Sequence, residues 1–70
     1  MIKEHLAQAR RHVAEGSEHV AHQREIVAKL EGDGHDTSEA KTLLDQFEKT
    51  QALHIADRDR LERELAETSN

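Results

Sequence analysis

The sequence predicts an all-α protein, an antiparallel hairpin of two long helices with the spacing of a coiled coil. Apolar residues recur at alternating steps of four and three along residues 2–30 and again along residues 40–65, which is the pattern of a coiled-coil seam. Proline is absent, and residues of high helix propensity predominate throughout the 70 residues. A short segment with two glycines separates the two stripes, so the chain can reverse there.

The first helix is predicted over about residues 2–31. An alternative is a break at Gly16-Ser17, where Ser17 could cap a new helix and give a bundle of three shorter helices. The stripe passes position 16 without a change of phase, and a glycine within a helix costs only about 1 kcal/mol, so one continuous helix is favoured. Its inward positions are Ile2, Leu6, Ala9, Val13, Gly16, Val20, Gln23, Val27 and Leu30.

The turn is predicted over residues 32–36. Gly32 is expected to supply the left-handed residue that ends the first helix, and Gly34 to let the chain reverse. Asp36 is then well placed to cap the second helix, with Thr37 one residue away as the rival cap. Glu39 stands three residues after Asp36, the spacing of a capping box.

The second helix is predicted over about residues 37–67, with residues 68–70 expected to fray, and residues 1–70 form one domain. Folding the stripes about the turn pairs residues whose numbers sum to about 70, so Gly16 is expected opposite His54. The inward positions of this helix are Ala40, Leu44, Phe47, Gln51, His54, Arg58, Leu61 and Leu65. The middle of the seam is polar, and this layer is expected to set register and oligomeric state: Gln23, Gln51, His54 and Arg58.

A single hairpin is expected to be too thinly packed to fold alone, because 70 residues lie near the size where one core supplies only a few kcal/mol. The chain has no cysteine, so no disulfide can reinforce it. Ile26, Leu43 and Ile55 widen the seam, which favours a two-fold dimer forming a four-helix bundle. The residues predicted for the core and the dimer are Leu6, Val13, Val20, Ile26, Val27, Leu30, Leu43, Leu44, Phe47, Ile55, Leu61 and Leu65.

Charge and hydropathy exclude two classes of partner. The formal net charge is −5, and a surface of this sign without a dense basic run repels nucleic acid. No stretch approaches the roughly 20 apolar residues of a spanning helix, and the charged N-terminus lacks the apolar segment of a secretory signal. A cytoplasmic location without membrane contact is therefore expected.

Six histidines in 70 residues are the strongest anomaly of composition. His5, His12 and His19 recur at intervals of seven and line one edge of the first helix. Histidine at such an edge could bind metal or sense pH, or could simply cover a half-buried flank. The candidate ligands are His19, His22 and His54, but the metal spacings known for helices are missing. No metal, cofactor or catalytic residue is therefore predicted.

The segment from His19 to Thr37, with its Gly-His-Asp-Thr turn, and the later residues Leu43-Leu44 and His54 to Arg58 resemble a group of short hypothetical proteins of alphaproteobacteria. The resemblance covers most of the chain. It implies a small bacterial helical protein, with no assigned activity and no catalytic residues.

The predicted function is therefore non-enzymatic, that of a small structural or protein-interaction module that acts as a homodimer and presents acidic faces to a protein partner. The alternative is a helical bundle that binds a metal or small ligand, or responds to pH, through the histidine-rich edge of the first helix.

Overall fold

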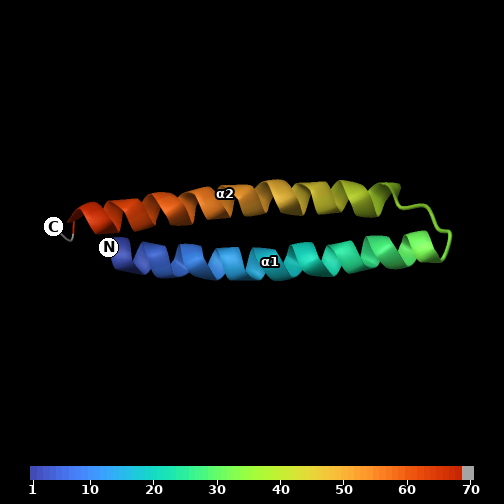
Figure 1. Cartoon of the computed structure of the whole chain (residues 1–70), viewed down its shortest axis with the longest axis horizontal. Helices are drawn as coiled ribbons and strands as arrows, with labels where there is room; N and C mark the ends of the chain where they lie inside the picture. The colour runs from blue at the N-terminus through green and yellow to red at the C-terminus, as the bar shows by residue number, and fades with distance from the viewer. Residues whose placement is uncertain (69–70) are drawn as a thin grey trace.

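The computed structural model describes residues 1–68, which form two antiparallel helices, α1 (Ile2–Gly32) and α2 (Ser38–Thr68). The helices lie side by side along their whole length in a rod of 56 × 14 × 14 Å (Figure 1). The predicted hairpin is thus confirmed. Because α1 runs through Gly16-Ser17 without a break, the three-helix alternative is wrong. Thr68 is helical rather than frayed, while Ser69 and Asn70 lie outside the described residues.

The glycine that takes the left-handed conformation at the end of α1 is not the predicted one. Gly34, with φ of 74°, is the left-handed residue, while Gly32 remains helical and Asp33 is the C-cap. The backbone N–H of Gly34 donates to Glu31 O (3.1 Å), and the backbone N–H of His35 donates to Leu30 O (2.9 Å). This pair of hydrogen bonds is the pattern of a Schellman motif. Either glycine can adopt this conformation, but ending at Gly34 lets α1 gain further helical hydrogen bonds.

The start of α2 is held by Asp36. The Asp36 Oδ1 accepts hydrogen bonds from the backbone N–H of Ser38 (2.9 Å) and from its hydroxyl (2.7 Å). The Thr37 carbonyl accepts the first hydrogen bond of the helix, from the backbone N–H of Lys41 (2.8 Å). The Asp36 carboxylate therefore accepts from Ser38, whereas the predicted capping box would have it accept from the N–H of Glu39, and Thr37, the rival cap, takes the backbone position of the N-cap. The bonds from Ser38 lower the pKa of the Asp36 carboxyl, with the backbone N–H contributing most.

A substitution of Asp36 should destabilise the hairpin in a pH-dependent way. A carboxyl whose pKa is depressed on folding contributes stability above its unfolded pKa and loses it as pH falls through the folded value. At pH 7 we expect Asp36→Ala to melt below the wild type, and Asp36→Asn, which keeps an acceptor oxygen, to fall between them. The advantage of wild type over Asp36→Asn should shrink below about pH 4, as followed by circular dichroism. An advantage that stayed constant down to about pH 2 would contradict this role.

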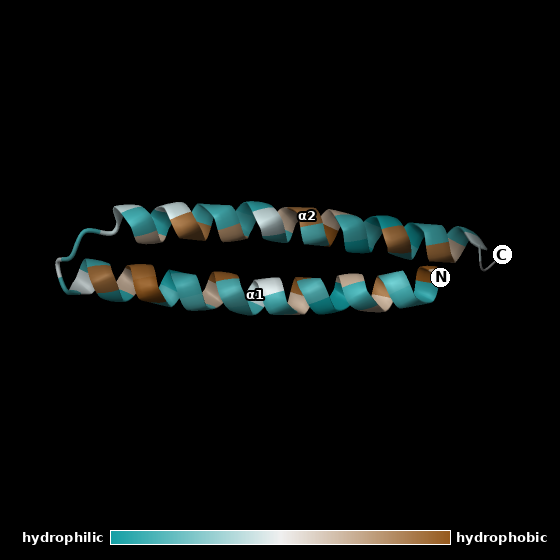
Figure 2. Ribbon diagram, turned by 180° about the vertical axis from the view of Figure 1, so that it is seen from behind, coloured by the Kyte–Doolittle hydropathy of each residue, from teal (hydrophilic) through white to brown (hydrophobic). Residues whose placement is uncertain are grey.

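The core between the helices is thin. Figure 2 shows hydrophobic residues interrupted by hydrophilic ones along both helices. At the end away from the turn, Leu6, Ala9 and Leu61 form a buried cluster, against which Ile2 and Leu65 pack. The buried residues are Leu6, Ala9, Val20, Gln23, Val27 and Leu61. The other predicted core residues are half-buried, namely Val13, Ile26, Leu30, Leu44, Phe47 and Leu65, or exposed, namely Leu43 and Ile55.

Gly16 of α1 faces the side chain of Gln51 of α2. A Cβ atom built at Gly16 would overlap the Gln51 Oε1 and stand 2.8 Å from its Cδ. The residue nearest to Gly16 is therefore Gln51 and not His54, as the predicted register had it. The amide of Gln51 occupies the space that the glycine leaves, because its own hydrogen bond, described below, holds it there.

Candidate functional site

Two glutamines of the predicted polar layer join the helices. The Gln23 Nε2 donates to Ala40 O (3.0 Å), and the Gln51 Nε2 donates to Val13 O (2.8 Å). Gln23 is only 5% exposed, and the Gln51 Oε1 is buried without a hydrogen-bond partner. A buried amide that is bound to one backbone position tolerates few alternative alignments, so this pair favours a single register.

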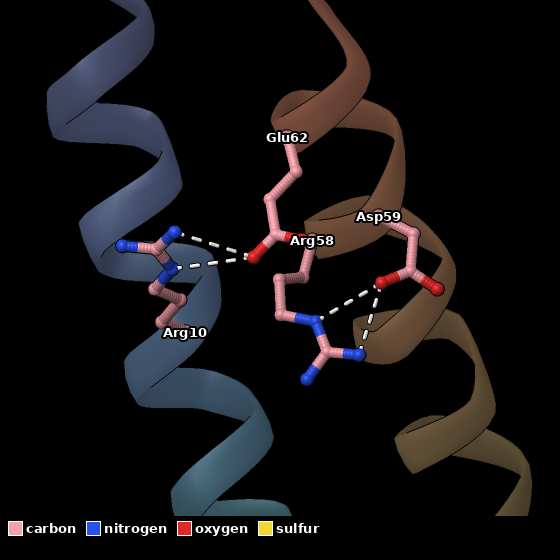
Figure 3. Close-up of polar contacts among 4 residues, drawn as sticks. All are labelled: Arg10, Arg58, Asp59 and Glu62. Atoms are coloured by element: carbon pink, nitrogen blue, oxygen red, sulfur yellow. Dashed lines mark hydrogen bonds and ion pairs between the residues drawn. The ribbon is translucent and has the colours of Figure 1, made fainter. Parts of the chain in front are cut away.

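The other two members of the polar layer behave differently. The Arg58 guanidinium donates to the adjacent Asp59 Oδ1 through Nε (3.1 Å) and Nη2 (2.9 Å), within α2 (Figure 3). The His54 ring instead packs against His12 of α1, with centroids 5.2 Å apart. His54 therefore reaches the opposite helix through an aromatic contact, while the guanidinium of Arg58 pairs within α2.

His5, His12 and His19 of α1 line one side of the hairpin. His19 stacks on Phe47 of α2 with centroids 5.7 Å apart, so it covers a half-buried aromatic ring. One open groove on this side is lined by His5, Gln8, Ala9, His12, Asp57, Arg60 and Leu61. A second is lined by His12, Glu15, Gly16, His19, Phe47, Thr50 and His54. Histidines of α1 and polar residues of α2 therefore share the same grooves.

The three candidate metal ligands are not brought together. His19 faces Phe47 and His54 faces His12, while His22 is exposed on α1. Among residues 1–68, no three His, Cys, Asp or Glu side chains are grouped closely enough to hold a metal ion. The interhelical pair of His12 and His54 was not expected from the sequence, because the assumed register placed Gly16 opposite His54.

The opposite side of the hairpin carries ion pairs between the helices. Arg10 Nη2 lies 3.3 Å from Glu62 Oε1 (Figure 3), Arg24 Nη2 lies 3.0 Å from Glu48 Oε2, and Lys41 Nζ lies 3.4 Å from Glu31 Oε1. All six side chains are 42% exposed or more, so each pair contributes little to stability. The regular spacing of these charged residues along both helices is a sequence signal for the register of the hairpin.

Further ion pairs lie within α2. Arg60 donates to Asp57 Oδ1 (2.7 Å) and Glu64 Oε1 (3.0 Å), and these bonds raise the pKa of its guanidinium, the Asp57 bond most. Lys49 pairs with Asp45 at 2.8 Å, and the hydrogen bond from Lys49 raises the pKa of its ammonium group. These groups are exposed and belong to solvated helix faces.

Within residues 1–68, neither helix combines the length and apolar character that a bilayer-spanning segment needs. The comparisons with known proteins returned no matching family model, no similar curated protein and no similar solved structure.

Proposed function

We propose that this chain is a non-enzymatic helical module that acts as a homodimer, in which two hairpins pack into a four-helix bundle and present acidic surfaces to a protein partner. The observation that carries this proposal is the thin core. Five apolar residues are buried among those described, and none of their side chains is below 2% exposure. A core of this size offsets little of the conformational entropy that folding removes.

The exposed area supports the same proposal. The hairpin exposes 5310 Å² at a mass of 8.0 kDa, whereas a compact monomer of this mass exposes about 4,450 Å². The excess of roughly 850 Å² is close to the area that each partner buries in a standard interface, about 800 Å². Packing against a second rod would therefore bring the exposed area of each chain close to that of a compact monomer of the same mass.

The surface chemistry supports an interaction role over catalysis. The grooves along the hairpin are open, and enclosed pockets with convergent polar groups are the usual setting for small-molecule chemistry. From residue 37 onward the sequence holds five Lys or Arg against eight Asp or Glu. An acidic, elongated surface of this kind is suited to a basic protein partner.

The molar mass in solution tests the dimer. We expect sedimentation equilibrium at micromolar concentration to give twice the chain mass of 8.0 kDa, and the melting temperature to rise with concentration, because assembly and folding are coupled. A folded species of 8.0 kDa whose melting temperature does not depend on concentration would overturn the proposal.

A further inference from the structure

The two long sides of the hairpin differ in what they leave for a second chain to contact. On the side of Arg10, Arg24 and Glu31, the charges are already paired across the helices. A partner that covered this side would have to desolvate three ion pairs, and the attraction within each pair seldom offsets that cost. This side is called the ion-pair face below.

The other side is called the histidine face. It is made of the residues that directly precede every second seam position of each helix. Leu43, which is 40% exposed, belongs to this face, whereas the exposed Ile55 lies on the ion-pair face beside Arg24 and Glu48. The members of the histidine face are His5, His12, His19 and Ile26 of α1, and Leu43, Thr50, Asp57 and Glu64 of α2.

The grooves on the histidine face set the level of its residues along the rod. His12 and Asp57 line one groove, and His19 and Thr50 line the next. Since both helices have the same rise per residue, the same register places His5 at the level of Glu64 and Ile26 at the level of Leu43. The face is therefore apolar near the turn, where Ile26 and Leu43 lie at one level. Toward the far end, histidines of α1 lie at the level of acidic residues of α2.

We infer that a second copy of this chain packs on the histidine face, with the two-fold axis parallel to the helices and both turns at the same end. The inference rests on the proposed function and adds the face and the orientation. Two hairpins that pack face to face can be related by a two-fold axis parallel to the helices or by one across them.

The side chains that meet across the interface distinguish these two arrangements. With the parallel axis, α1 lies against α2 of the second copy, so His12 meets Asp57 of that copy and His5 meets its Glu64. Arg60 binds only Oδ1 of Asp57 and Oε1 of Glu64, which leaves the second oxygen of each carboxylate for histidine. Histidine then faces a carboxylate at two levels of the interface.

With the axis across the helices, α1 lies against α1 of the second copy, running in the opposite direction. His12 then meets His19 of that copy, and on the α2 side Leu43 meets Glu64. This arrangement sets an apolar side chain against a carboxylate, which is unfavourable, and leaves the imidazoles without a carboxylate opposite them. The parallel axis instead brings Ile26 against Leu43 of the second copy near the turn.

Single cysteines test the orientation, because the chain has no cysteine of its own. Asp33→Cys places a spin label in the exposed turn, and Lys3→Cys places one at the far end of α1. For both, we expect pulsed electron paramagnetic resonance to give distances between chains below about 30 Å, the width of two to three helices. Turns at opposite ends would give about 40–50 Å along the axis at both sites, at 1.5 Å per residue.

A matched pair of substitutions tests the face. Thr50 on the histidine face and Ser17 on the ion-pair face are both exposed hydroxyl residues in the middle of a helix. Thr50→Arg should weaken dimerisation by at least about tenfold, because a long charged side chain would be desolvated in the interface. Ser17→Arg should leave the dimer dissociation constant unchanged within about twofold.

The outcomes separate the inference from the proposed function. A monomer of 8.0 kDa would overturn both. A dimer with long label distances, or one weakened by Ser17→Arg and not by Thr50→Arg, would overturn the inferred geometry and leave the homodimer standing.

Discussion

Leu61→Ala is expected to unfold most of the protein at 25 °C. Leu61 is 6% exposed and forms the buried cluster at the open end of the hairpin with Leu6 and Ala9. Removing a buried leucine side chain beyond Cβ costs about 2–5 kcal/mol, and a domain of this size has a net stability of only about 3–5 kcal/mol. The helical signal in circular dichroism should fall at the lowest temperatures measured, with loss of the cooperative melting transition.

The control for this loss is Leu61→Met, which keeps nearly the same volume and apolar character. A swap of this kind costs less than about 1.5 kcal/mol, so Leu61→Met should retain a cooperative transition at a lowered midpoint. If Leu61→Ala melted with the wild-type midpoint, the cluster would not be the part of the core on which folding depends.

Gly16→Ala is expected to destabilise the hairpin although alanine is the better helix former. The new methyl group would occupy the position of the Gln51 Oε1, and Gln51 cannot swing aside without breaking its 2.8 Å bond to Val13 O. Overpacking of this kind costs about 1–3 kcal/mol, against a gain of about 1 kcal/mol in helix propensity. We therefore expect a lower free energy of unfolding in urea.

Gly16→Ala should instead raise the free energy of unfolding when the Gln51 side chain has first been removed. In Gln51→Ala the space facing Gly16 is open, so adding Gly16→Ala should stabilise the double variant by about 1 kcal/mol relative to Gln51→Ala. The difference between the two backgrounds measures the coupling of residues 16 and 51. An effect of equal sign in both backgrounds would show that the two residues do not meet.

Much of the fold could be predicted because the apolar pattern of each helix and the residues that end it are local features of the sequence. The step of four and three residues fixes which side of each helix is buried, and the two helices begin and end within one residue of the predicted bounds. The choice between Gly32 and Gly34 could not be made from the sequence, because both glycines are free to adopt positive φ and only the bonds of Gly34 and His35 decide it.

The pairing of individual side chains could not be predicted, because it depends on contacts between the helices. A seam pattern alone does not say that Gln51 reaches Val13, or that His12 rather than Gly16 meets His54. Arg58 was expected in the polar layer, yet its guanidinium pairs with Asp59, the next residue in the chain. The ion pairs of Arg10 with Glu62 and of Arg24 with Glu48 could have been found, since antiparallel seams place such flanking residues opposite each other.

The placement of Ile2 and Thr68 at the same end of the rod, with the turn at the other (Figure 1), has a consequence for protein engineering. Spliced into a surface loop of a host protein, the hairpin would leave and re-enter its host at neighbouring points, as a stalk 56 Å long. Any epitope grafted between Asp33 and Thr37 would then be displayed at the tip of that stalk, far from the host.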